Sequence, residues 1–336
     1  MIKRFFIINL YWLIPFIFII VSLRIGAYEI SFEDIVKLLI AKINNCAYDE
    51  IINGVIFEVR LPRIISVVLV ASALSVSGAI FQAIFRNPLA DPYTLGVSNG
   101  AGFGASLAIV LSLGFILTQL SAVAFAILAV LLTFVFSFFG KNLSINLILS
   151  GMLISALFSS LLAFIKFIAD PFDKLPEIVY WLMGTFSGSS YEKISYILPI
   201  YLIVFVFIYL YRYKINVLSM GDLQAQIFGV NARRDKIIII LLCTILTALA
   251  VSMCGIIGWV GIVVPHIVRI LVGVDFRKIF PLSISIGICY LLLIDNICRS
   301  ISVLEIPIGV VTGLLGLPLF LYFIYQKRFE YNAFRA

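Results

Sequence analysis

Long apolar runs separated by short polar links dominate this sequence. A transmembrane helix needs about 20 consecutive apolar residues, and ten runs approach that length, with the eighth expected to be short or kinked because it holds four glycines and a proline. The pattern predicts an all-α, polytopic integral membrane protein with about ten transmembrane helices in a single domain spanning residues 1–336. The predicted helices cover approximately 5–23, 64–85, 94–113, 121–139, 145–168, 194–211, 237–254, 255–273, 280–298 and 308–325.

One polar stretch, Ser219 to Lys236, interrupts this pattern between two strongly apolar runs. Ser219 and Asp222 have the spacing of a capping box, and Gly229 is placed to end a short helix in the left-handed conformation. We therefore expect a helix from Met220 to Phe228, followed by a new helix that Asn231 caps.

This short helix carries an apolar face although it lies outside the predicted spans. Leu223, Ile227 and Phe228 fall on one face by i, i+4 spacing, and such a face outside the bilayer favours contact with a protein partner. The ordinary alternative is a solvated loop whose basic residues only mark the cytoplasmic side. The apolar face favours a docking element.

Composition excludes several classes of protein. The chain is 63% hydrophobic and 12% charged, so it is not a soluble globule. Its net charge of +7 follows from the bias of membrane proteins towards cytoplasmic Lys and Arg, and no aromatic and basic patch suggests nucleic acid binding. The five cysteines lack metal-binding or disulfide spacing, so we expect neither a disulfide framework nor a metal site. We also expect no cofactor bound by this chain.

Charge also predicts the orientation in the membrane. Ten helices place both termini on one side. If that side is the cytoplasm, it holds 15 of the 24 Lys and Arg but only 5 of the 17 Asp and Glu, as the positive-inside rule requires. The apolar run after Lys3 and Arg4 has no small-residue cleavage site, so we expect a retained first helix.

Chemical motifs are mostly lacking. The one Gly-Lys pair, Gly140 and Lys141, is followed by Asn142 and does not form a nucleotide-binding P-loop. The single histidine, His266, has no carboxylate or cysteine in helical register, which favours a packing role over a ligand or proton relay. Asp295 and Arg299 have the spacing of an ion pair within one helix.

Six motifs in order make the chain resemble the FecCD/BtuC-type permease subunits of ABC importers for iron(III)-siderophores, haem and cobalamin. The resemblance extends from about residue 58 to residue 325. The motifs are RLPR (60–63), RNPLADPYTLGVSNGAG (86–102), YWLMGTFSG (180–188), GDLQAQIFGVN (221–231), GWVGIVVPHIVR (258–269) and EIPIGVVTGLLGLPLFLY (305–322).

The resemblance implies a BtuC-like subunit of the cytoplasmic (inner) membrane with no bond chemistry of its own. It would pair with a second permease copy, two cytoplasmic ATPase subunits that bind ATP and Mg²⁺, and a periplasmic or surface-tethered binding protein. Residues that match the family's ATPase-coupling helices are Gly221, Asp222, Leu223, Gln226, Ile227, Phe228, Gly229, Val230 and Asn231.

The resemblance also implies roles for two other groups. Arg60, Arg63 and Arg299 match outward-facing arginines that dock the binding protein through its acidic residues, a task for which the planar guanidinium is suited. Asn142, Leu143 and Ser144 match the inner gate.

The cargo and the class of transporter leave alternatives. The resemblance and the charge-poor interior favour an iron(III) chelate of the siderophore or citrate type, followed by haem and then cobalamin. A secondary transporter is disfavoured by the scarcity of charges in the helix centres, and a membrane-embedded enzyme by the absence of paired catalytic groups.

Overall fold

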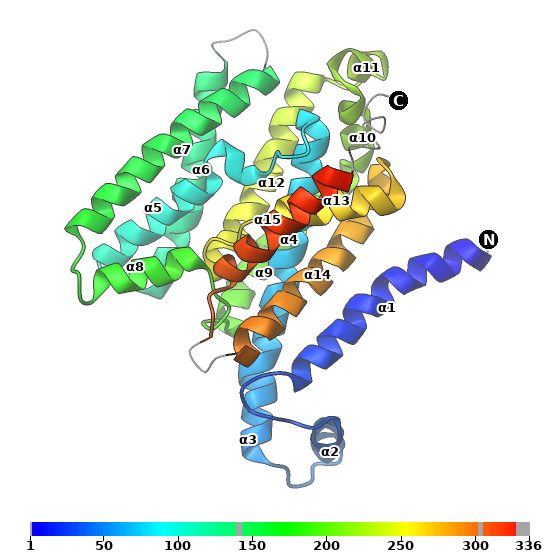
Figure 1. Cartoon of the computed structure of the whole chain (residues 1–336), viewed down its shortest axis with the longest axis vertical. Helices are drawn as coiled ribbons and strands as arrows, with labels where there is room; N and C mark the ends of the chain where they lie inside the picture. The colour runs from blue at the N-terminus through cyan, green and yellow to red at the C-terminus, as the bar shows by residue number, and fades with distance from the viewer. Residues whose placement is uncertain (1, 139–142, 302–304, 327–336) are drawn as a thin grey trace.

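The computed structural model describes residues 2–138, 143–301 and 305–326, and this part of the chain is helical with no strand (Figure 1). The elements are α1 (Ile2–Arg24), α2 (Phe32–Ile43), α3 (Glu50–Asn53), a π-helical segment (Gly54–Arg60), α4 (Leu61–Phe85), a 3₁₀ turn (Pro92–Leu95), α5 (Val97–Val110), α6 (Phe115–Ser137), α7 (Leu143–Ile168), α8 (Lys174–Met183), α9 (Tyr191–Leu210), α10 (Arg212–Met220), α11 (Asp222–Ile227), α12 (Ala232–Cys254), α13 (Val260–Val272), α14 (Phe276–Ile301) and α15 (Ile308–Gln326).

The all-α membrane architecture predicted from the sequence is confirmed. Within the described residues, six helices are long and apolar enough to cross a membrane, and four shorter apolar helices lie in α1, α5, α13 and α15. They correspond to the ten predicted runs. The eighth run, expected to be short, forms the 13-residue helix α13 with Pro265 inside it.

Three helices were not predicted, because they lie in segments with no long apolar run. These are α2, α8 and α10. The prediction that the second span begins after Pro62 was also wrong. A continuous helix runs from Glu50 to Phe85, and the turn before Pro62 is π-helical. The proline ring lacks an N–H and, in a regular α-helix, clashes with the carbonyl four residues before it. A π-helical turn shifts the hydrogen bonds to the fifth preceding carbonyl, which lets Pro62 lie inside a long helix.

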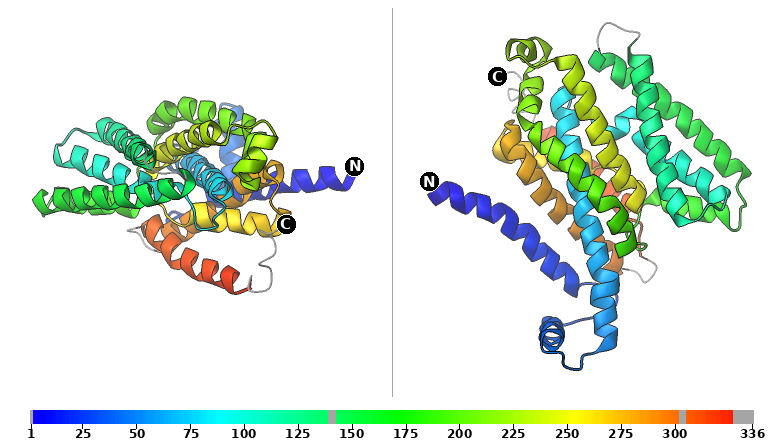
Figure 2. Two further views of the ribbon diagram at one scale, coloured as in Figure 1. Left: turned by 90° about the horizontal axis from the view of Figure 1, so that it is seen from above. Right: turned by 180° about the vertical axis from the view of Figure 1, so that it is seen from behind.

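The centre of the molecule is α4. Most of its side chains are buried, and α12, α13 and α14 pack around it (Figure 2). Small residues allow close approach: a Cβ added to Gly78 would overlap the carbonyl oxygen of Gly261 in α13. Helices α5, α6 and α7 form a second group beside this centre.

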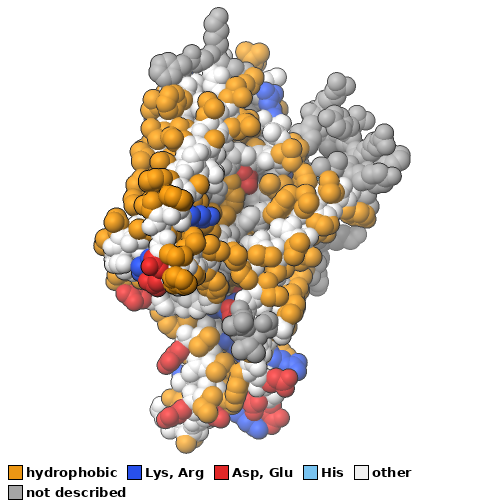
Figure 3. Space-filling view, turned by 60° about the vertical axis from the view of Figure 1, so that its left-hand side comes forward, with side chains coloured by type: hydrophobic (Ala, Val, Ile, Leu, Met, Phe, Trp, Pro, Cys, Tyr) orange, Lys and Arg blue, Asp and Glu red, His pale blue; other side chains and the backbone are white. Residues whose placement is uncertain are grey.

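The two ends of the bundle differ in character. α11 lies at one end, and α2 and α3 lie at the other (Figure 1). Hydrophobic side chains cover most of the face shown in Figure 3, and charged side chains gather at its lower end. This distribution is typical of a protein surrounded by lipid along its middle.

Candidate ATPase-coupling and gating site

Helix α11 presents an exposed apolar surface at its end of the bundle. Leu223, Ile227 and Phe228 are 73%, 82% and 54% exposed, whereas Ala225 is fully buried. Phe228 is the residue at which the helix ends. The predicted apolar face is therefore exposed in the subunit, as a docking surface requires.

The start of α11 differs from the prediction. Gly221, which has no side chain to cap with, is the N-cap residue. Ser219 instead belongs to the last turn of α10, where its hydroxyl donates to the Asn216 carbonyl at 2.7 Å. The predicted capping box at Ser219 and Asp222 was wrong.

The end of α11 agrees with the prediction. Gly229 has a φ of +74°. The Val230 N–H donates to the Ala225 carbonyl at 2.8 Å, and the Gly229 N–H donates to that of Gln226 at 3.0 Å, which together form a Schellman motif. The Asn231 carboxamide then accepts from the Arg234 N–H at 3.0 Å and caps α12.

A buried lysine connects α11 to the start of α7. The Lys236 ammonium lies 2.5 Å from the Asp222 carboxylate and donates to the Ser144 hydroxyl at 3.0 Å. Lys236 is 3% exposed, so water competes little for either contact. The first residue of α11 and the second residue of α7 thus share one cation.

This connection was not predicted, because the sequence shows Lys236 only as the last residue of the polar stretch and gives no sign of its partners. Of the three predicted gate residues, Leu143 and Ser144 form the first turn of α7, and Asn142 lies outside the described residues. Their assignment as a gate stays a prediction.

A second polar contact holds α10, the helix that precedes α11. The Asn216 carboxamide donates to the Asp275 carboxylate at 3.0 Å and accepts from the Phe276 N–H at 2.6 Å. Partial burial opposes the charged form of Asp275. The hydrogen bonds from Asn216 and Arg277 outweigh it and lower the pKa of that carboxyl group. The contact joins α10 to the beginning of α14.

At the opposite end of the bundle, the three arginines predicted to face outward are buried instead. Arg60, Arg63 and Arg299 are 3%, 5% and 5% exposed. Arg60 donates to the carbonyl oxygens of Leu23, Arg24 and Tyr28. The expectation that these arginines are exposed was wrong, because they are satisfied within the subunit by carbonyls at the end of α1 and in the link after it, and by acidic groups of α14 and the segment after it. Their docking role stays a prediction.

Arg63 and Arg299 belong to a charge network centred on Asp295. The Arg63 guanidinium lies 2.9 Å from the Asp295 carboxylate and 2.7 Å from the Glu305 carboxylate. The Arg299 guanidinium lies 3.7 Å from the Asp295 carboxylate. Arg299 also donates to the Ser22 carbonyl at 2.5 Å. The predicted pair of Asp295 and Arg299 is confirmed, but Arg63 makes the closer contact with Asp295. The network fixes α1, α4, α14 and the segment before α15 together.

His266 lies inside α13 and is 5% exposed. Its ring meets the edge of Phe320 in α15 with 5.7 Å between centroids. This placement agrees with the packing role predicted for it. Among the described residues, no group of three or more His, Cys, Asp or Glu could hold a metal ion.

Comparison with known proteins identifies the family to which this chain is similar. A family model described as the FecCD transport family matches residues 13–326. The molybdate import system permease protein MolB of Haemophilus influenzae is 38% identical over 92% of each chain. A probable iron chelatin transport system permease protein of Helicobacter pylori is 35% identical over 92% of this chain and 95% of its own.

The fold has a solved counterpart. A structure described as an inward-facing conformation of a proposed metal-chelate type ABC transporter is 36% identical, with a TM-score of 0.86 over 95% of this chain and 99% of the other. The resemblance noted from six motifs is therefore confirmed over nearly the whole chain. The chain belongs to the FecCD transport family, the permease subunits of ABC importers.

Proposed function

We propose that this subunit forms half of the translocation pathway of an ABC importer and that residues Gly221–Asn231 receive the motion of a partner ATPase. The observation that carries this proposal is the exposed face of Leu223, Ile227 and Phe228 on a short helix between two membrane spans. Apolar side chains so exposed outside the membrane spans favour burial in a groove of a partner protein.

The contacts around α11 support a path for that motion. Displacing α11 would move Asp222 and, through Lys236, Ser144 at the start of α7. The contact between Asn216 and Asp275 would carry the same displacement to α14. The first link runs through the buried Lys236 and the second through the half-buried Asn216 and Asp275, and hydrogen bonds of charged groups are strong where water is partly excluded.

This subunit has no part in ATP hydrolysis under the proposal. Two ATPase subunits would bind ATP and Mg²⁺ in the cytoplasm, a second permease copy would complete the pathway, and a binding protein would deliver the cargo. Both termini and α11 would then be cytoplasmic, and α2 and α3 would face outward, as the charge distribution favours.

The proposed cargo is an iron(III) chelate of the siderophore or citrate type. Similarity to the iron chelatin permease of Helicobacter pylori supports it. Haem and cobalamin are alternatives of the same kind, since the hemin permease HmuU of Yersinia pestis is 33% identical. Molybdate is a further candidate because MolB is 38% identical.

Reconstitution tests the proposal. The permease would be assembled in liposomes with its ATPase subunits and binding protein, and uptake of ferric citrate, a ferric siderophore, hemin, cobalamin and molybdate would be compared. We expect uptake of a ferric chelate that requires ATP and continues after a protonophore collapses the proton gradient. Uptake that follows the proton gradient without ATP would instead indicate a secondary transporter.

A further inference from the structure

A cavity of about 540 Å³ lies at the end of the bundle away from α11, within this one subunit. Its walls are the end of α5, the start of α6, α8, the start of α9 and the end of α12. This volume lies within the range of small-molecule sites in proteins. The cavity shares no residue with α11, the gate or the network around Asp295.

The feature that distinguishes the cavity is the ammonium of Lys193. Lys193 lines the cavity and is 8% exposed. Within the described residues its ammonium is paired with no carboxylate and donates to no hydrogen-bond acceptor. It lies over the Phe115 ring, 4.1 Å from the ring centroid. Buried charges are normally paired, because removing an ion from water is costly.

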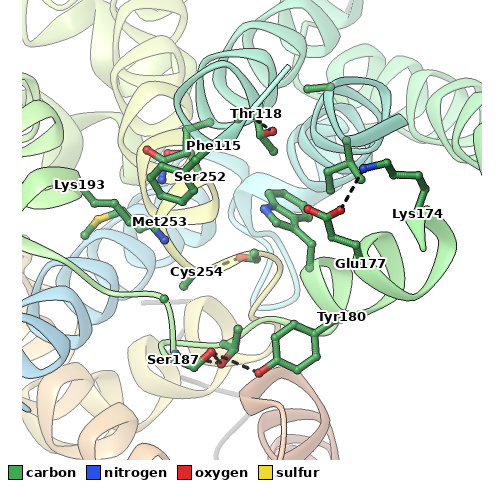
Figure 4. Close-up of a pocket in the computed structure, with 18 of the residues that line it drawn as sticks. Phe115, Thr118, Lys174, Glu177, Tyr180, Ser187, Lys193, Ser252, Met253 and Cys254 are labelled. Carbon is green, nitrogen blue, oxygen red and sulfur yellow. Dashed lines mark hydrogen bonds and ion pairs between the residues drawn. The ribbon is translucent and has the colours of Figure 1, made fainter. Parts of the chain in front are cut away.

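Local structure does not supply the missing negative charge. Lys193 lies in the first turn of α9, where the helix dipole is positive and disfavours a cation. Glu177 is the acidic side chain that lines the cavity, and its carboxylate lies 4.0 Å from the ammonium of Lys174, not beside Lys193. Figure 4 shows Lys193 and Phe115 on one side of the cavity and the pair of Lys174 and Glu177 on the other.

Two further sources of hydrogen-bond donors line the cavity. The Gln119 Nε2 is buried without a hydrogen-bond partner. Helix α6 begins at Phe115 after Gly114, and no side chain caps it, so the N–H groups of its first turn are not taken by a capping side chain. An ammonium, an amide donor and a helix N-terminus together favour a ligand with negatively charged oxygens.

We propose that this cavity binds a small solute anion, a carboxylate or a tetrahedral oxyanion, with Lys193 as its counter-ion. Gln119 and the first turn of α6 supply neutral donors to the same anion. The site is complete within one subunit and does not depend on which cargo the importer carries.

The test is anion binding to the permease–ATPase complex in phosphatidylcholine nanodiscs without the binding protein. Calorimetric titration with molybdate and with citrate is expected to show saturable binding of at least one of them, and glycerol none. Lys193→Met should weaken that binding by at least about tenfold, the loss expected for one charge-assisted hydrogen bond. Lys193→Arg should retain most of the affinity, and Gln119→Leu should reduce it less than Lys193→Met.

Lys37→Met provides the matched control, because Lys37 is exposed in α2 and paired with Glu33. It should bind as the unaltered protein does. Absence of binding in the unaltered protein, or equal binding in Lys193→Met, would overturn the proposal. Binding of phosphatidylglycerol that depends on Lys193 and that molybdate and citrate do not displace would assign the cavity to a lipid headgroup and overturn the solute assignment.

Discussion

The Lys236 ammonium, on the fifth residue of α12, lies 2.5 Å from the carboxylate of Asp222, the first residue of α11. The two charges differ in environment, since the Lys236 side chain is 3% exposed and that of Asp222 is 53% exposed. The buried partner also holds Ser144. The pair therefore joins a solvent-facing helix to the interior of the bundle.

Removing this cation should uncouple ATP hydrolysis from transport. In Lys236→Met, the methionine fills similar space but holds neither Asp222 nor Ser144. We expect ATPase activity to persist in the assembled complex while transport falls by about tenfold or more, the loss expected when a charged hydrogen bond is removed. Arg234→Met is the control, since that side chain is exposed. Equal transport by both variants would remove Lys236 from the path.

Gly229 tests the geometry of the coupling helix. A Cβ at this position would meet no atom within 4 Å, so any penalty comes from its φ of +74° alone. Gly229→Val should cost about 1 kcal/mol or more and weaken ATPase binding and transport. Gly229→Asn should behave almost normally, because asparagine tolerates this conformation. If both variants were equally active, the left-handed end of α11 would not matter for coupling.

The network around Asp295 predicts a stability effect. Asp295 is completely buried, so within the described residues Arg63→Met leaves its carboxylate with only the longer contact to Arg299. Breaking a buried pair costs about 3–5 kcal/mol, whereas the double variant Arg63→Met with Asp295→Asn should cost less than the single change. Thermal unfolding of the purified subunit measures both. A normal melting temperature for Arg63→Met, with lost affinity for the binding protein, would instead favour the docking role.

Asp91 predicts a pH dependence. It lies between α4 and the 3₁₀ turn, and burial raises the pKa of its carboxyl group to about 6, against the lowering effect of the Thr94 and Tyr93 N–H groups. A raised pKa means that folding favours the protonated form, so this contribution is present below pH 4 and is lost as the pH rises through about 6. Asp91→Asn keeps the N-cap acceptor for Thr94.

This variant should raise the stability by up to about 3 kcal/mol at pH 7.5 and by about half as much at pH 5. Melting temperatures at the two pH values provide the measurement. A variant less stable than the unaltered protein at pH 7.5 would mean that the Asp91 carboxylate is charged and favourably bound.

The sequence predicted what depends on neighbouring residues. The ten apolar runs, the cap at Asn231 and the left-handed Gly229 all follow from local patterns. The wrong capping box at Ser219 shows the limit of such patterns, because the same spacing at Ser31 and Asp34 does form one. At Asp222 the preceding glycine separates two helices and takes the N-cap position.

Contacts between distant parts of the chain could not be predicted. Arg63 meets Asp295 across 232 positions, and Lys236 meets Ser144 across 92. Periodicity describes one helix at a time and does not say which faces meet. For the same reason no local pattern distinguishes Lys193, whose cavity depends on the positions of five helices.

Photo-crosslinking from Ile227 in the assembled complex tests the coupling role of α11. A photoreactive phenylalanine analogue would replace Ile227, which is 82% exposed on α11, and in a control would replace Phe172, which is 93% exposed in the link between α7 and α8. Ile227 is expected to crosslink to the ATPase subunit with a yield that changes on ATP binding, and Phe172 is expected not to crosslink to it. An assembled, active complex in which Ile227 gives no ATPase crosslink would contradict the coupling role of α11.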